Sequence, residues 1–271
     1  QNGYVDHSTF SDNTTIYLKN LDGTPLVLTH PIDNATLYRV SYYNPVRLNG
    51  NLLSSSYSEL DDWSPFLVKF DSSGSLEWER IFGSTSSDQA HSVKVDSSDN
   101  IFVAGATKGI LDDQSTLSRL PGHVNSDAFI RKYNPTGNPD EIWTWQTKTG
   151  HNMEVGAADD ARDMIIDHSN GAIYLVGNGA AMYGQTGEGG YDWSLFKFNY
   201  NGTSDPSLDW VRLYGSNNND GYGKAGNAVT ISPSGEILYG GISSKGVGGH
   251  SYLGGKYDVY VVKYNLNGVK Q

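Results

Sequence analysis

The chain of 271 residues contains no cysteine. This absence excludes disulfides, thiolate zinc sites and thiol nucleophiles, but large β domains can be secreted without disulfides, so it identifies no compartment. No apolar run approaches the roughly 20 residues of a membrane-spanning helix, and no charged-then-apolar leader is seen at the start, so we expect a soluble chain. Basic residues are few: 19 Lys and Arg stand against 30 Asp and Glu, for a net charge of −11. This charge repels phosphate backbones, so nucleic acid is not an expected partner.

Tyrosine and glycine are abundant instead, with 18 Tyr and 32 Gly. Together with many Ser, Asn and Asp, these residues are typical of short strands joined by tight turns. The composition therefore predicts an all-β protein without long helices.

A first kind of hairpin, with two apolar strands around a polar turn, occurs four times. In its clearest copy, 90–105, the turn runs from Asp96 to Asn100. Asp, Ser and Asn are the residues that such a turn requires. Two other copies span 161–177 and 226–241. The fourth copy, 35–50, is degenerate and would pair 35–41 with 46–50.

A second kind of hairpin alternates with the first. Its first strand is apolar and ends in Lys and an aromatic residue, and its turn ends in Gly. In the three complete copies, the second strand carries a Trp that lies five residues before a Gly. Its lysines are Lys69, Lys132, Lys197 and Lys263, which lie 63, 65 and 66 residues apart. One pair of hairpins, or four strands, is therefore the repeated unit, and this is typical of a propeller blade.

We therefore predict a single domain over 1–271, a β-propeller of four-stranded blades with five blades in the ring. The repeat units are about 31–83, 84–150, 151–215 and 216–271, and an N-terminal hairpin at 14–30 is a fifth, degenerate copy of the second kind of hairpin. The last unit lacks the strand that carries Trp in the others, so we expect the N-terminal segment to close the ring and cover the exposed edge. Two alternatives remain open: the edge accepts a strand from a neighbouring chain, or the chain is part of a longer array.

The repeat resembles a known family. The pattern Asp-x-Phe-x-x-Lys-Tyr-Asn-x-x-Gly, then Trp-x-Arg-x-Phe-Gly, then Asp-x-Ala leading to Val-x-Val-Asp, resembles the bacterial β-propeller repeat family labelled SBBP. The resemblance covers about 60–268 and is best over 84–105, while the spacers after Gly105, Gly177 and Gly241 are longer than is usual in the family. It implies a propeller in an exported or surface protein, usually without catalytic activity, and it implies no particular ligand.

The long connections are expected on one face. In an up-and-down blade, the turns within hairpins lie at one end, and the connections between hairpins and between blades lie at the other. The turns within hairpins are short here, whereas connections such as 106–126, 178–191 and 242–257 are long. Binding is expected on this long-loop face, because a rigid scaffold displays the loops there.

Acidic and aromatic residues recur at the long-loop face. Asp62, Asp127, Asp192 and Asp258 precede the third strand of each unit, and Asp33, Asp88 and Asp159 precede the first. Such acids could bind Ca²⁺ or a cationic partner, but their regular recurrence favours capping of loop N–H groups, and no cofactor or metal site is predicted. Trp63 and Trp193 follow two of these acids and are expected to be exposed there. The candidate ligand-binding residues are these two tryptophans and Asp62, Asp127, Asp192 and Asp258.

The predicted function is a non-enzymatic binding or adhesion module, secreted or at the cell surface, that recognises carbohydrate or protein through the long-loop face. A structural subunit of an extracellular filament or assembly, joined through an incomplete blade, is one alternative. A glycan hydrolase on a five-bladed propeller is the other. Such a catalytic site needs carboxylates that depart from the repeat, whereas the acids here follow it, so no catalytic residue is predicted. Sequons make Asn13, Asn34 and Asn201 glycosylation candidates.

Overall fold

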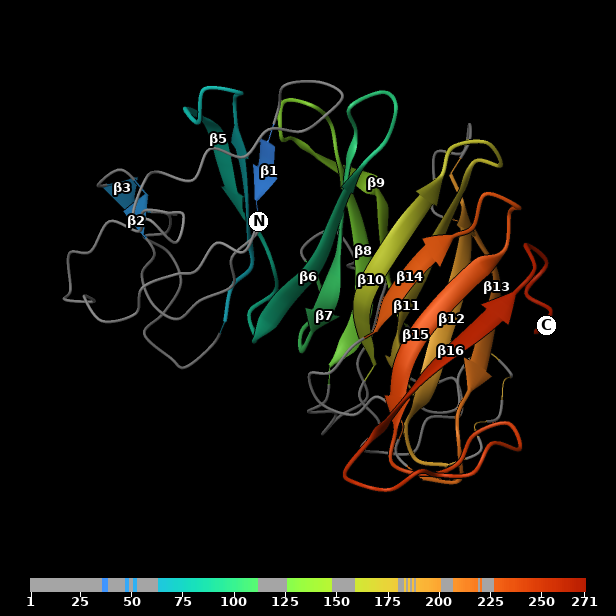
Figure 1. Cartoon of the computed structure of the whole chain (residues 1–271). Helices are drawn as coiled ribbons and strands as arrows, with labels where there is room; N and C mark the ends of the chain where they lie inside the picture. The colour runs from blue at the N-terminus through green and yellow to red at the C-terminus, as the bar shows by residue number, and fades with distance from the viewer. Residues whose placement is uncertain are drawn as a thin grey trace. The chain divides into compact units, whose positions relative to one another are not determined.

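A computed structural model describes most of the chain beyond residue 62. The described residues are 63–111, 126–147, 159–179, 189–200, 207–218 and 227–271, with strand pieces at 36–38, 47–48 and 51–52 and residues 183, 185, 187 and 220. Over these residues the protein is all-β, with antiparallel sheets and no helix (Figure 1). Contacts group the chain into two compact units, Gln1–Phe82 and Gly83–Gln271. The predicted all-β class is confirmed, and the single domain stays a prediction.

No helix in the described part of the chain is long and apolar enough to cross a membrane.

The first unit contains one three-stranded sheet and one small ladder. The sheet has the order β1 (Thr36–Tyr38), β4 (Phe66–Phe70), β5 (Leu76–Ile81), and the ladder pairs β2 (Arg47–Leu48) with β3 (Asn51–Leu52). The predicted pairing of 35–41 with 46–50 is wrong, because β1 pairs directly with β4. The polar residues Arg47 and Asn49 interrupt the apolar pattern that makes the other copies of this hairpin regular. The predicted N-terminal hairpin at 14–30 lies outside the described residues.

The second unit contains three sheets that each keep the order of the chain (Figure 1). The first sheet consists of β6 (Asp88–Val95), β7 (Ile101–Thr107), β8 (Asp127–Tyr133) and β9 (Pro139–Gln146). The second consists of β10 (Asp160–Asp167), β11 (Ala172–Gly179), β12 (Asp192–Asn199) and β13 (Ser207–Tyr214). The third consists of β14 (Ala228–Ile231), β15 (Ile237–Ser243) and β16 (Asp258–Tyr264). The strands of 84–150 and 151–215 thus group into sheets of four, as the repeat predicts.

The short turns within hairpins are fixed by the side chain of their first residue. The Asp96 carboxylate accepts the backbone N–H groups of Ser98 at 2.8 Å and Asn100 at 2.9 Å. Asn134 accepts two backbone N–H groups of its own turn in the same way, each at 3.0 Å. Asp71, Asp167 and Asn265 hold the corresponding place in three further turns. The side-chain oxygen replaces backbone partners that a tight turn leaves unpaired, which explains why Asp and Asn recur there.

These turn carboxylates make stability depend on acid. Burial raises the pKa of Asp167, but hydrogen bonds from Ser169 and Asn170 outweigh burial, so the pKa lies below its ordinary value of 3.8. Hydrogen bonds from Ser73 and Ser75 also lower the pKa of Asp71. A carboxylate whose pKa is lower in the folded state adds stability above the unfolded pKa, and this stability is lost as the pH falls through the folded pKa.

We therefore expect the free energy of unfolding to fall as the pH drops from 5 to 3. In Asp167→Asn the fall is expected to be smaller by about 0.5 kcal/mol, because the turn keeps its acceptor but loses the titrating group and solvent screens part of the effect. Denaturant unfolding at several pH values measures the difference. The reciprocal variant Asn134→Asp is expected to steepen the fall, and equal slopes in all three proteins would contradict the assignment.

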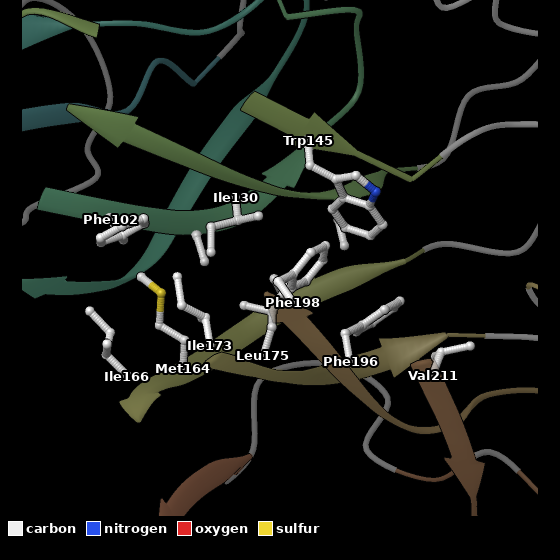
Figure 2. Packing of buried hydrophobic residues seen from close by; sticks show 13 residues of the cluster. Phe102, Ile130, Trp145, Met164, Ile166, Ile173, Leu175, Phe196, Phe198 and Val211 are labelled. Atoms are coloured by element: carbon white, nitrogen blue, oxygen red, sulfur yellow. The ribbon is translucent and has the colours of Figure 1, made fainter. Parts of the chain in front are cut away.

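The first and second sheets pack face to face through a buried apolar cluster. In Figure 2 the side chains of Phe102, Ile130 and Trp145 point from the first sheet toward those of the second. The Trp145 ring lies 4.8 Å from the ring of Phe198 and 5.4 Å from that of Phe196, both edge to face. Each of these fully buried aromatic side chains contributes roughly 1.5–3 kcal/mol relative to an exposed one. The Trp that recurs in the fourth strand therefore packs between sheets in this copy.

The first strands of the three sheets lie against one another, with β10 between β6 and β14. The Asp163 carboxylate of β10 accepts the Ser92 hydroxyl of β6 at 3.0 Å and the backbone N–H of Val229 of β14 at 3.2 Å. The ammonium group of Lys94 lies 3.4 Å from the same carboxylate. One side chain thus connects the first strands of three successive sheets.

Candidate functional site at the long-loop face

The strand order of the second unit separates short turns from long connections. Because neighbouring strands are antiparallel and follow the chain, all even-numbered strands from β6 to β16 begin at the same end of their sheets. The connections that lead into these strands include the spacers 108–126, 180–191 and 244–257. The long-loop face of this unit is the end of the three sheets at which the even-numbered strands begin.

Buried aspartates cap the connections between sheets. The Asp88 carboxylate accepts the backbone N–H of Ser84 at 2.5 Å and its hydroxyl at 3.0 Å. The Asp220 carboxylate accepts the backbone N–H of Ser216 and its hydroxyl, the latter at 3.1 Å. Asp88 is 1% exposed and Asp220 is fully buried. Both pairs follow the spacing Gly-Ser-x-x-x-Asp, so these two loops are held by the same kind of cap.

Asp220 is a recurring residue that the sequence prediction missed. Its backbone N–H donates to the carbonyl oxygen of Tyr191 at 2.6 Å, and the N–H of Asp159 donates to that of Ser126 at 2.8 Å. Tyr191 and Ser126 are the residues directly before Asp192 and Asp127. Asp220 therefore holds in the repeat unit 216–271 the place that Asp159 holds in the unit 151–215, and its Gly-Ser-x-x-x-Asp spacing was the signal for it.

The aspartates before the third strands also hold their loops. Asp127 is 1% exposed and accepts the amide N–H of Gln146 at 3.0 Å, while the same amide donates to the carbonyl oxygen of Gly109 at 2.8 Å. Asp258 accepts the backbone N–H of Leu253 at 2.5 Å. The Asp258 contact is the loop capping expected from the sequence, whereas Asp127 acts through the side chain of Gln146, whose amide holds the Gly109 carbonyl.

The carboxylates of Asp192 and Asp220 converge on Gly215. Asp192 is fully buried, and a Cβ atom on Gly215 would collide with a carboxylate oxygen of each aspartate, so only glycine fits there. The described residues contain no group of three or more His, Asp or Glu side chains that could hold a metal ion. The predicted site residue Asp62 and the sequons Asn13, Asn34 and Asn201 lie outside the described residues.

Trp193 is not exposed, which corrects the expectation from its place after the loop. It is 1% exposed, and its indole N–H donates to the carbonyl oxygen of Ile242 in the third sheet at 3.0 Å. Its ring packs against Tyr239 at 5.9 Å and lies over Gly241, where a Cβ atom would come within 2.7 Å of it. Trp193 is therefore a packing residue between the second and third sheets. Trp63, in the first unit, is partly buried.

Two β-bulges occur at equivalent places in the first strands. The register of β6 shifts between Ala90 and Ser92, and that of β10 shifts between Ala161 and Asp163. The extra residue in β6 is His91. In β10 it is Arg162. A bulge bends the strand and redirects its extra side chain, and bulges are enriched beside functional sites.

A glycine faces each bulge. A Cβ atom on Gly105 or Gly177 would overlap the carbonyl oxygen of Gln89 or Asp160 respectively. The glycines inside these apolar strands were the sequence signal for the bulges, although the sequence prediction did not use it. In the third sheet of the second unit, Asn227 directly precedes β14 at the place that matches His91 and Arg162.

Polar contacts surround these side chains. The Arg162 guanidinium is ion-paired with Asp160, and the two side chains remain 21% and 20% exposed. Asp160 also accepts the Ser126 hydroxyl at 3.0 Å, and the amide N–H of Asn227 donates to the side-chain oxygen of Asn178 at 2.5 Å. The Nε atom of Arg162 and the Oδ1 atom of Asn227 are buried without a hydrogen-bond partner. The bulge of β10 and the matching place before β14 therefore hold a donor and an acceptor with unused hydrogen-bonding capacity.

Comparison with known proteins gives one partial similarity. No family model matches the chain. Over 160 residues, or 57% of its length, the chain is 28% identical to the regulatory protein FlaEY of Caulobacter vibrioides. The matched segment spans only 16% of that protein.

Proposed function

We propose that the sheets are blades of a β-propeller with five blades, closed into a ring by the N-terminal segment 14–30. Three observations support this: the sheets are antiparallel and keep chain order, their first strands lie side by side, and each sheet of the second unit packs face to face on the next. A four-stranded unit repeated about an axis is the architecture that combines these features.

The outer face of the third sheet supports a further neighbour. Val259 and Val261 of β16 are 79% and 70% exposed. The matching residues of β12, Trp193 and Leu195, are each 1% exposed because the third sheet covers them. Ring closure would bury the two valines in the same way.

The proposed function is a non-enzymatic binding module, secreted or at the cell surface, that recognises carbohydrate or protein through the long-loop face. The observation that carries this proposal is a set of buried aspartates: Asp88 and Asp220 cap loop N–H groups, and Asp127 holds the amide of Gln146 that binds the Gly109 carbonyl. Loops held in this way present a fixed surface at low entropic cost. The partial similarity to FlaEY, a protein named as regulatory, is also compatible with a binding module.

Site-directed blocking tests the proposed face, because the chain has no cysteine and a single introduced thiol can be labelled selectively. Ser251→Cys places a polyethylene glycol chain on the long-loop face, and Ser97→Cys places it on a short turn; both serines are exposed. The probes are an array of immobilised oligosaccharides and a phage-displayed peptide library. We expect the Ser251 conjugate to lose at least tenfold in affinity and the Ser97 conjugate to bind as the unlabelled protein does. Absence of binding to both probe sets, or loss only at Ser97, would overturn the proposal.

A structural subunit is the second candidate, and the exposed face of the third sheet favours it. The large apolar side chains that are exposed in the described residues all lie in or beside β16: Leu253, Tyr257, Val259, Val261 and Val269. Patches of this kind mark interfaces. Native mass spectrometry over a wide concentration range separates the candidates, because a closed ring stays monomeric and a joined assembly forms multimers.

A further inference from the structure

We infer that His91, Arg162 and Asn227 form a carbohydrate-binding site on the long-loop face. The inference rests on the proposed binding function and deepens it, because it names the ligand class and the residues that contact the ligand.

The hydrogen bonds of Asp163 bring the three side chains together. Asp163 directly follows Arg162, and it binds Ser92, which directly follows His91. It also binds the backbone N–H of Val229, two residues after Asn227. Because one carboxylate spans these three contacts, the positions of His91, Arg162 and Asn227 are neighbours on adjacent first strands.

The backbone directs the side chains of His91 and Arg162 away from the regular strand pattern. An extra residue in a strand leaves the ladder and aims its side chain away from the alternating faces. The glycines Gly105 and Gly177 permit the bulges at a site where any side chain would clash with backbone. A packing role alone does not account for polar residues at all three matching places, since the neighbouring Ala90 and Ala161 are buried and apolar.

The chemistry of the site fits a sugar better than an anion. A sugar hydroxyl both donates and accepts hydrogen bonds, and planar polar groups arranged as donor and acceptor match vicinal hydroxyls. Arg162 supplies donors beside the acceptor Asp160, and Asn227 supplies an amide. Because the charge of Arg162 is balanced by Asp160 and Asp163 lies next to it, the site offers little attraction to phosphate or sulfate.

Two unused polar atoms add to the expected affinity. The Nε atom of Arg162 is a donor and the Oδ1 atom of Asn227 is an acceptor, and both are buried without a partner. A buried polar group that lacks a partner has lost its hydrogen bonds to water without replacement, which costs free energy. A ligand hydroxyl that reaches either atom after a small side-chain movement recovers part of this cost. The Arg162 side chain is 21% exposed, so solvent reaches part of it.

The experiment measures binding of the whole chain to an array of neutral, uronic-acid and amino-sugar oligosaccharides, followed by titration calorimetry with the best binder. We expect Arg162→Ala and Asn227→Ala each to weaken binding at least tenfold. Arg162→Lys keeps a cation beside Asp160 but removes the planar fork, and we expect at least a fivefold loss. Lys108→Ala is the matched control, because it removes an exposed cation from the same face, and it should change affinity less than twofold.

Thermal unfolding separates lost contacts from lost folding. We expect Arg162→Lys to unfold within about 2 °C of the wild type, so that its loss of affinity reports contact with the ligand. Unchanged affinity in all three site variants would overturn the inference, even where the Ser251 conjugate blocks binding and the proposed function stands. Failure of the wild type to bind any oligosaccharide would also overturn the inference of a carbohydrate site. The proposed binding function would still stand in that case if the protein bound a peptide and the Ser251 conjugate did not.

Discussion

Replacing Gly177 with alanine is expected to lower the free energy of unfolding by about 4 kcal/mol or more, or to prevent folding. A Cβ atom at this place would overlap the carbonyl oxygen of Asp160 and lie 2.8 Å from its carbonyl carbon. These atoms belong to the backbone beside the β10 bulge, so no side-chain rotation can relieve the clash. The strand would have to lose its bulge or separate from β11. Urea unfolding followed by circular dichroism measures the change.

Gly240→Ala is the matched control for this prediction. Gly240 also lies within the second strand of a sheet, but the atom closest to its added Cβ, the carbonyl oxygen of Ala228, is 4.0 Å away. Alanine should therefore fit and change stability by less than about 1 kcal/mol, with a gain possible from the smaller entropy of the unfolded chain. Equal effects of the two substitutions would contradict the bulge.

The features that sequence reasoning predicted correctly are local. The turn at Asp96 to Asn100 is visible because a few adjacent residues determine both its shape and its hydrogen bonds. The grouping of strands follows from the same turns repeated at nearly constant intervals. The caps at Asp88 and Asp258 were also predictable, because a carboxylate that recurs beside a loop commonly accepts backbone N–H groups of that loop.

The features that were missed depend on contacts between distant segments. Trp193 follows a loop residue, so its sequence neighbourhood suggests exposure, but the partners that bury it include Gly241 and Ile242 of the next sheet. The burial of Trp193 depends on which face of the second sheet packs on the third sheet. The alternation of side chains along a strand does not specify that choice. The candidate site at His91 and Arg162 was missed for a related reason. A bulge adds one residue to a strand, so the side chains beyond it no longer follow the alternation that the sequence predicts. The sequence signal for each bulge was a glycine in the partner strand.

The second large effect is expected for Trp193→Ala, at about 4 kcal/mol of lost stability. The substitution empties a site that is 1% exposed, and it removes the donor to the Ile242 carbonyl oxygen, which is then left buried without that bond. Trp193→Phe keeps most of the ring and is expected to cost about 2 kcal/mol. Leu253→Ala is the control, because this leucine is 90% exposed and its truncation should cost less than about 0.5 kcal/mol.

Denaturant unfolding without any ligand decides between the two roles considered for Trp193. A ligand-binding residue loses affinity when it is replaced but leaves the free protein stable, whereas a packing residue destabilises the free protein. The tilted contacts of its ring with Tyr214 and Tyr260, at 6.0 Å each, place Trp193 in the second class. A stable Trp193→Ala protein with near-native unfolding would show that the second and third sheets do not pack through this residue. Loss of binding by that variant could then be assigned to contact with the ligand, as the sequence alone suggested.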